Sequence, residues 1–277
     1  MADNYCLMKI DERFQAEADK YAAYLETPEG RLRLDLPFAN LREILPLPGA
    51  SASLRALDLG CGTGANGLRL ARLGYHVTLM DVSGPMLEIA QRAAQEAGLM
   101  EKVETKQGYA DRFADFFDEP AFDLILCHNI LEFVEDPSAV VRSSARALRN
   151  SSGILSVLVR NRAGDVLKAA ILSGDVDAAT HTLTAEWGNE ALYGGKVRLF
   201  TPEATRSMLR AASLEVIAER GVRVMADYLS PRVSLSDEYD RVFALERQLG
   251  GRPDFSAIAR YTHFLARRAN TTIRDDS

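Results

Sequence analysis

Hydrophobic and polar positions along the chain form short continuous apolar runs separated by helical patterns. The apolar runs predict strands at residues 54–59, 75–80, 103–107, 122–127 and 153–159. Helical patterns lie between them at 65–73, 84–97, 111–117 and 137–148, and two further helices, at 13–25 and 37–45, precede the first strand. Runs such as FDLILC are typical of parallel strands that are buried on both faces. The pattern therefore predicts an α/β fold built on a mostly parallel sheet.

The last third of the chain extends this sheet. The segments LEVIAERGVRVMADY and IARYTHFLARR predict two more strands around a helix at 236–249, and residues 161–200 interrupt the alternation as an insertion. The sequence contains no internal repeat and no low-complexity linker. We therefore expect a single domain over residues 1–277, with N-terminal helices in residues 1–50 and an insertion at about 161–200 on the substrate side.

Charge and cysteine usage narrow the class of protein. The 277 residues carry a net charge of −6, and residues 101–140 hold ten acids against three bases, whereas residues 153–224 hold nine bases against eight acids. This balance argues against a general nucleic-acid coat but allows a local basic site. The apolar runs are too short to span a bilayer and the N-terminus lacks a signal-peptide pattern. Three cysteines without a C-x-x-C spacing favour a cytoplasmic protein without structural zinc.

Four glycines lie within eight positions after the first predicted strand, in LDLGCGTGANG. Two glycine patterns overlap there. Residues 62–67 read G-x-G-x-x-G, a dinucleotide-binding signature, and residues 58–64 read D-x-G-x-G-x-G. Ligands of open α/β sheets bind at the carboxyl ends of the strands, which is where this loop falls. The loop therefore predicts close approach of a nucleotide-like ligand to the backbone.

Three further strand ends carry residues suited to such a ligand. Asp81 ends YHVTLMD, 23 residues beyond Asp58, where a carboxylate accepts hydrogen bonds from ribose hydroxyls or caps the next helix. Asp111, in GYADRF, is either a contact to the base or an ordinary helix cap. His128, in CHNILEFVEDP, ends a strand above the same site, although a single histidine is often structural.

Several stretches resemble S-adenosylmethionine (SAM)-dependent methyltransferases. D-x-G-x-G-x-G resembles their motif I, and residues 128–137 resemble their H-x-x-L-x-x-V-x-D-P phrase. The blocks GRLRLDL, YHVTLMDVSGPML, GILSVLVRNRAGDVLKAAILSGD, GVRVMADYL, YDRVFALERQLG and ARYTHFLARR are similar, in order, to blocks of the tRNA 5-carboxymethoxyuridine methyltransferase (CmoM/SmtA) family. The resemblance covers nearly the whole chain, and its later blocks are more specific than the glycine loop.

The resemblance implies a Rossmann-like class I methyltransferase fold, with a mostly parallel seven-stranded sheet, an antiparallel C-terminal strand and helices on both faces. It implies a SAM-dependent enzyme that forms the methyl ester of 5-carboxymethoxyuridine at the wobble position, with the tRNA anticodon loop as substrate. Arg33 would bind the SAM carboxylate. The full set of predicted cofactor-binding residues is Arg33, Asp58, Gly60, Cys61, Gly62, Gly64, Asp81, Val82, Ala110, Asp111 and His128.

Methyl transfer from SAM to a carboxylate requires few catalytic groups. A carboxyl group with a pKa of about 4 is already ionised at pH 7, so no catalytic base and no metal are predicted. The anionic substrate instead needs cations and hydrogen-bond donors for its alignment, and the predicted residues are Arg160, Arg162, Arg223 and Tyr228. We expect a basic face that includes Arg160, Arg162, Lys168, Lys196 and Arg198. For Trp187, Tyr193 and Phe200 we expect base stacking or core packing.

Three other functions remain open from the sequence. A methyltransferase acting on the carboxyl or hydroxyl group of a small molecule would accept methyl groups without tRNA. A non-catalytic SAM-binding partner subunit would bind the cofactor without turnover. A NAD-dependent dehydrogenase would bind NADH instead of SAM. The phrase after the fourth predicted strand favours SAM over NAD.

Overall fold

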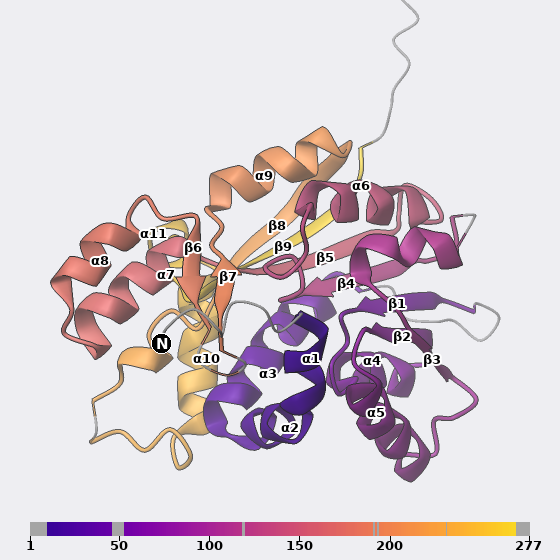
Figure 1. Ribbon diagram of the computed structural model, residues 1–277, viewed down its shortest axis with the longest axis horizontal. Coiled ribbons are helices and arrows are strands. Elements are labelled where there is room, and N and C mark those ends of the chain that lie inside the picture. Colours follow the sequence, from indigo (N-terminus) through magenta and orange to yellow (C-terminus); the bar gives the residue numbers. More distant parts are fainter. Residues whose placement is uncertain are drawn as a thin grey trace, which may run out of the picture.

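The computed structural model describes residues 10–45, 53–117, 120–190, 192, 194–230 and 232–269. Its main sheet has seven strands in the order β3-β2-β1-β4-β5-β9-β8 (Figure 1). The bounds are Arg55–Leu59 (β1), His76–Asp81 (β2), Val103–Gln107 (β3), Leu124–His128 (β4), Ile154–Arg160 (β5), Leu214–Val222 (β8) and Tyr261–Arg268 (β9). Strand β9 pairs antiparallel with both β5 and β8, and the other pairs are parallel. The predicted mostly parallel sheet with an antiparallel C-terminal strand is confirmed.

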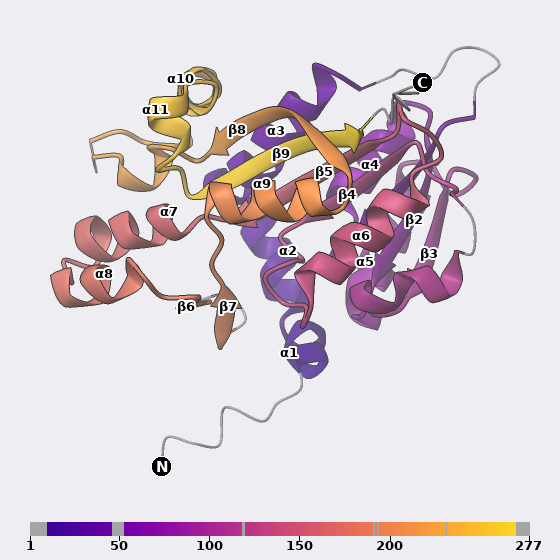
Figure 2. The ribbon, with the colours of Figure 1, turned by 90° about the horizontal axis from the view of Figure 1, so that it is seen from above.

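Helices cover both faces of this sheet (Figures 1 and 2). One face buries α6 (Pro137–Ala147), α9 (Pro202–Ala211) and the 3-10 helix η2 (Ala110–Phe116) against β1, β4 and β5. The other face buries α3 (Pro28–Arg42), α4 (Ala65–Arg72) and α5 (Gly84–Glu96). The 3-10 helix stands where the sequence predicts an α-helix at 111–117. The helices α10 (Tyr239–Gly250) and α11 (Pro253–Ser256) pack near the β8 end of the sheet.

Short polar residues define where several of these helices begin. The side chains of Thr27, Ser83, Asp136 and Thr201 each accept a hydrogen bond from a backbone N–H three residues later, and a proline stands at the first or second helical position each time. Both features satisfy or remove backbone donors that a helix N-terminus leaves without partners. The strand-to-helix junctions, where ligands bind, are thereby fixed locally.

The N-terminal helices differ from the prediction. In place of helices at 13–25 and 37–45, the chain forms α1 (Ile10–Ala16), α2 (Ala18–Glu26) and α3, which begins at Pro28. Pro37 lies inside α3, although a proline is more common at the first helical position. The Thr27 cap determines the true start. Residues 46–50 of the predicted N-terminal segment lie outside the described residues.

Residues 161–200 form a separate group of short elements at one end of the sheet (Figure 2). They are α7 (Arg162–Leu167), the π-helical turn η3 (Lys168–Leu172), α8 (Val176–Thr182) and a hairpin of β6 (Trp187–Asn189) and β7 (Lys196–Arg198). The Arg198 N–H donates to the Glu132 carbonyl and the Phe200 N–H to the Arg160 carbonyl. These bonds hold the insertion beside the carboxyl ends of β4 and β5. Tyr193 lies outside the described residues.

Candidate cofactor and substrate site

A cavity of about 270 Å³ opens at the carboxyl ends of β1, β2 and β4. This position is the expected one for the ligand of an open α/β sheet. Eight of the predicted cofactor residues line it: Arg33, Gly60, Gly62, Asp81, Val82, Ala110, Asp111 and His128. Residues from α1, α2 and the segment after β4 complete its walls. The fold therefore gathers most of the predicted set into one cavity.

The glycines of the loop after β1 are required by the backbone and by packing. Gly60, Gly62 and Gly64 have φ angles of +71°, +53° and +74°, a region that side chains disfavour. A Cβ atom at Gly60 would lie 2.7 Å from the Ile130 side chain, and one at Gly62 would lie 3.0 Å from the Tyr21 ring. The glycine pattern in the sequence predicts close approach of a ligand to the backbone as the reason for these glycines. The structure shows a left-handed turn tightly packed against side chains of the protein.

Asp81 binds the glycine loop through one of its oxygens. Its Oδ2 accepts the Gly62 N–H at 2.8 Å, and its Oδ1 accepts the Ser83 N–H at 2.9 Å. Burial raises the pKa of this carboxyl above its ordinary value, while these backbone donors act in the opposite direction. A carboxylate offers about four acceptor positions, so the two oxygens retain capacity for ribose hydroxyls.

Three predicted cofactor residues build the loop and do not line the main cavity. Asp58 accepts the Gly67 N–H at 3.0 Å and thereby joins β1 to α4, and burial raises its pKa to about 7. Gly64 is the N-cap residue of α4. Cys61 lines a smaller adjoining cavity together with Asp58, and burial holds the pKa of its thiol well above the ordinary value. This thiol is therefore a poor nucleophile.

Arg33 reaches the cavity from α3. Its Nε donates to Asn129 Oδ1 at 2.9 Å, and its guanidinium carbon lies within 6 Å of the Tyr21, Tyr24 and Tyr261 ring centroids. Asn129 has a φ of +54° and donates in turn to Glu132 Oε1 at 3.1 Å. Left-handed non-glycine residues are uncommon and cluster at functional sites. Asn129, which the sequence analysis missed, directly follows His128 at the end of β4.

Aromatic and aliphatic side chains supply the rest of the wall. Phe14 from α1 packs edge-to-face on Phe133, with 5.1 Å between the ring centroids, and both line the cavity. Tyr109, Met86 and Ile130 complete this apolar part. A cavity lined both by apolar side chains and by the carboxylates of Asp81, Asp111 and Glu135 suits a nucleoside, because the base packs against carbon while the ribose hydroxyls bind oxygen. The lining therefore fits SAM, and the assignments of Asp81 to the ribose and of Arg33 to the amino-acid carboxylate stay predictions.

The residues predicted to align the substrate lie outside this cavity, and three of them are already engaged. The Arg160 guanidinium is buried between Asp165 at 3.0 Å and Glu190 at 2.9 Å. The Arg223 guanidinium pairs with Asp227 and donates to Tyr24 Oη at 3.0 Å. The Tyr228 hydroxyl donates to the Gly164 carbonyl at 3.2 Å.

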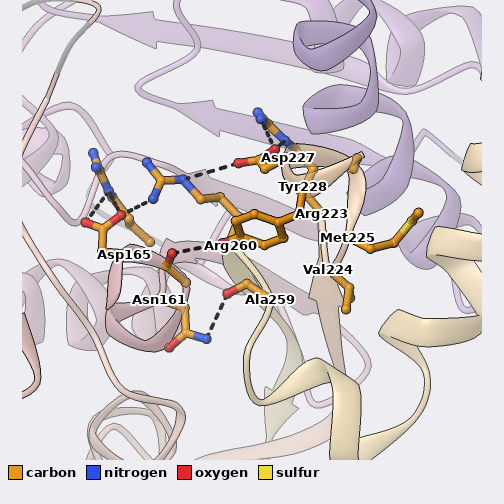
Figure 3. A network of polar contacts seen from close by, with 12 residues as sticks. Asn161, Asp165, Arg223, Val224, Met225, Asp227, Tyr228, Ala259 and Arg260 are labelled. Atoms are coloured by element: carbon orange, nitrogen blue, oxygen red, sulfur yellow. Dashed lines mark hydrogen bonds and ion pairs between the residues drawn. The ribbon is translucent and has the colours of Figure 1, made fainter. Parts of the chain in front are cut away.

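Arg260 links these contacts into one network, because it pairs with Asp165 and its Nε lies 3.9 Å from Asp227 Oδ2 (Figure 3). We call Arg160, Arg223, Arg260, Asp165, Asp227 and Glu190 the arginine network. It contains three cations and three anions. Arg160 therefore does not belong to an exposed basic face, and the substrate roles of Arg160, Arg223 and Tyr228 stay predictions.

Two cations beside the arginine network behave differently. Arg162 is half-buried at the start of α7, no other described residue forms an ion pair with it, and its Nε is buried without a partner. Lys168 is half-buried on η3. Burial, followed by the charges of Arg260 and Arg160, lowers the pKa of its amine. These two side chains keep donors that an anionic ligand would satisfy.

Among the described residues, no helix is both long and apolar enough to cross a membrane. The same part of the chain holds no group of three or more histidine, cysteine or acidic side chains arranged for a metal ion.

Comparison with known proteins gives the class. Residues 57–157, from β1 to β5, match the family model described as a methyltransferase domain. A SAM-dependent methyltransferase from Thermotoga maritima, described as a possible histamine N-methyltransferase, has a TM-score of 0.61 and 15% identity, and the match covers 94% of this chain and all of that one. The CcbJ methyltransferase of Streptomyces caelestis gives a TM-score of 0.61 at 17% identity. The chain is a SAM-dependent methyltransferase with the class I fold, and SAM is its cofactor.

Curated relatives fall into two groups by substrate. The chain is 28% identical to the tRNA 5-carboxymethoxyuridine methyltransferase of Escherichia coli K12 over 265 residues, which cover 93% of this chain and 97% of the relative. It is 33% identical to the ubiquinone biosynthesis O-methyltransferase of Xylella fastidiosa over 174 residues, which cover 58% of this chain and 65% of the relative. The higher identity thus belongs to the shorter match.

Proposed function

We propose that this enzyme transfers a methyl group from SAM to the carboxylate of 5-carboxymethoxyuridine at the wobble position of tRNA. The observation that carries the proposal is the extent of the likeness to the E. coli tRNA methyltransferase, which covers 93% of this chain. A match of that extent must include much of the insertion and of the C-terminal strands. The match to the Xylella relative covers 58% of the chain. Substrate-side elements are the part of a methyltransferase that varies with the substrate.

The position of the insertion supports a large substrate that approaches beside the cofactor. Arg198 Nη2 of β7 lies 3.4 Å from the carbonyl of Glu135, a residue that lines the cavity. The Lys20 amine of α2 donates to the Leu192 carbonyl in the β6–β7 hairpin at 2.6 Å. Trp187 is 44% exposed on the same hairpin, and its ring lies 4.6 Å from the Arg198 guanidinium carbon. A cation and an exposed indole side by side suit a nucleic-acid substrate.

The chemistry requires alignment more than proton transfer. SAM supplies an electrophilic methyl group, and the substrate carboxylate is ionised at neutral pH. Asp81 and Arg33 hold the two ends of the cofactor, and Phe14, Ile130 and Phe133 form an apolar part of the cavity wall. We assign the Arg162 guanidinium to the substrate carboxylate, because no other described residue forms an ion pair with it. Lys168, half-buried on η3, is a second cation of the same insertion.

A hydroxyl-methylating enzyme of the ubiquinone type is the second candidate, favoured by the 33% identity of the Xylella relative. A phenolic substrate has a pKa near 10 and needs a base to remove its proton. Burial together with the charge of Arg33 lowers the pKa of His128, the histidine that lines the cavity, to about 3. Such a histidine is a weak base, which favours the carboxylate substrate.

The test is nucleoside mass spectrometry of tRNA from a strain that lacks the gene. We expect loss of the methyl ester and accumulation of the free acid, with restoration by the wild-type gene. Purified protein should methylate tRNA from that strain in the presence of SAM. An unchanged nucleoside profile, together with methylation of a small phenol in place of tRNA, would overturn the proposal.

The role of Arg162 is tested in the same assay. Arg162→Ala should lower kcat/KM by about 10- to 150-fold, because a charge-assisted hydrogen bond is lost. Arg162→Lys should recover little, since a point charge does not reproduce the two-pronged guanidinium contact. Arg142→Ala is the matched control, because Arg142 is an exposed arginine on α6 whose ion pair is with Asp136.

A further inference from the structure

We propose that Ser156 and His263 are positioning residues, which fix the ring orientation and the tautomer of His128 at the cofactor cavity. The inference concerns the cofactor cavity, so it holds for any methyl acceptor. His128 ends β4 and lines the cavity, whereas Ser156 and His263 are fully buried inside the sheet. A change at either buried residue can therefore reach the cofactor only through a neighbour.

A continuous set of polar contacts joins these residues. His128 Nε2 lies 2.8 Å from Ser156 Oγ, which lies 2.8 Å from His263 Nε2. His263 Nδ1 lies 3.4 Å from the side-chain nitrogen of Asn40 on α3, and His128 Nδ1 lies 3.4 Å from the side-chain amide of Asn66 on α4. This set of polar contacts thus crosses β4, β5 and β9 and ends on two helices that cover the same face of the sheet.

The strand register explains how residues so distant in sequence meet. His128 stands opposite Leu158 in the β4–β5 pair, and His263 stands opposite the same Leu158 in the β5–β9 pair. Ser156 lies two residues before Leu158 and therefore on the same face, where its hydroxyl sits between the two imidazoles. The two rings are 5.4 Å apart and nearly perpendicular, at 87°. A shift of one residue in the register of either strand pair would break these polar contacts.

Hydrogen-bond accounting then sets the tautomers. The Ser156 hydroxyl has one hydrogen, so it donates to one imidazole and accepts from the other. The Asn40 amide donates to His263 Nδ1, which leaves the His263 proton on Nε2, facing Ser156. Ser156 then donates to His128 Nε2, and the His128 proton is on Nδ1. The Asn66 oxygen, buried without a partner, accepts this proton when the amide is turned by 180°.

This arrangement makes His128 a fixed, uncharged wall of the cavity. The charged group facing it is Arg33 on α3, and the groups acting on His263 are His128 and Arg220 on β8. Burial and these charges lower the pKa of both rings, that of His128 to about 3. A protonated ring at this place would repel the sulfonium of SAM, and a mobile ring would narrow the cavity. Both ring nitrogens of His128 are engaged, by Asn66 and by Ser156, so neither remains to act as a base.

The experiment is nitrogen-15 NMR of the imidazoles in protein labelled at histidine. The chain has four histidines, and His76 and His181 are exposed. We expect His128 and His263 to show opposite, single tautomers that do not change between pH 5.5 and 8. Identical tautomers for the buried pair, or a tautomer mixture at either ring, would overturn the proposal without any variant being made.

Variants test the link to the cofactor. Ser156→Ala should convert His128 to a tautomer mixture and raise the Kd for SAM by about 3- to 10-fold in calorimetry, as expected for one lost neutral hydrogen bond. His263→Gln should change the His128 signals although residue 263 does not line the cavity. Ser144→Ala is the matched control, a fully buried serine on α6 whose contact is Cys127 Sγ at 3.8 Å. An unchanged His128 tautomer in Ser156→Ala would contradict the positioning role.

Discussion

The cofactor cavity and the arginine network lie at the same end of the sheet but use their charges in opposite ways. In the cavity, the Asp81 oxygens accept two backbone N–H groups and retain further acceptor positions. In the arginine network, Arg160 alone meets Asp165, Glu190 and the Asn189 carbonyl. A carboxylate held by the backbone still has capacity for a ligand, whereas a guanidinium held by carboxylates has little left.

The comparison shows that a charged residue at a strand end is insufficient evidence of a ligand contact. Arg160, Arg162 and Arg223 are similar in sequence terms, since each follows or ends a strand near the ligand side. In the folded chain Arg160 and Arg223 hold the insertion, β8 and α2 together. Arg162 is the member of this group whose guanidinium lacks an ion pair with any other described residue. The number of hydrogen bonds already formed separates architectural arginines from candidate substrate contacts.

The largest expected effect is on the arginine network. Asp165→Ala leaves Arg160 and Arg260 without their shared carboxylate in a site where all three side chains are less than 10% exposed. Removing one partner of a buried ion pair typically costs about 3–5 kcal/mol. We expect a loss of that size in the free energy of unfolding, measured with urea. Glu203→Ala, which breaks exposed pairs on α9, should cost far less, because solvent screens surface ion pairs.

The cofactor cavity should respond more in cofactor affinity than in stability. Asp81→Ala removes the carboxylate that we propose as acceptor of the ribose hydroxyls, which should weaken SAM binding by about 1.5–3 kcal/mol in calorimetry. The free energy of unfolding should change less than for Asp165→Ala. If Asp81→Ala bound SAM as tightly as the parent enzyme, the ribose assignment would be wrong.

Asp58 gives a pH-dependent test within the loop. Its pKa is about 7 in the folded protein, above the ordinary value near 4, so the folded state binds the proton more tightly. Its favourable contribution is therefore present at low pH and lost as the pH rises from about 4 through 7. Asp58→Asn cannot ionise and still accepts the Gly67 N–H. We expect its stability relative to the parent to improve by about 1–3 kcal/mol from pH 5 to pH 8. A pH-independent difference would contradict the raised pKa.

The smallest effect concerns the exposed charge of the hairpin. Lys196 is exposed on β7, and in the proposed function it meets tRNA phosphate. Lys196→Ala should reduce the slope of log affinity against log salt by about 0.7–0.9 and leave SAM binding unchanged. Arg112, exposed in the acidic segment at 101–140, is the control. An equal change of slope in Arg112→Ala would show that the RNA covers the acidic face as well.

The sequence by itself determined the sheet and the place of the cofactor. Continuous apolar runs predict β1 to β5 to within about two residues, and the glycine loop and Asp81 stand at strand ends that parallel pairing brings to one edge. The predicted helix at 37–45 begins too late. Its predicted start falls on Pro37, whereas Thr27 and Pro28 already begin α3 and Pro37 lies inside that helix. These strands can be predicted because a strand that is buried on both faces has a continuous run of apolar residues.

The tertiary structure alone decided which polar groups are already bound. Phe14 and Tyr21 line the cavity although both lie more than thirty residues before β1, and no periodicity connects them to the loop. Ser156 lies between His128 and His263 only through the register of three strands. The guanidinium groups of Arg160 and Arg223 are already paired with Asp165 and Asp227. Hydrogen bonds and ion pairs are formed between residues distant in sequence, so the physical state of a polar side chain is fixed by its neighbours in space.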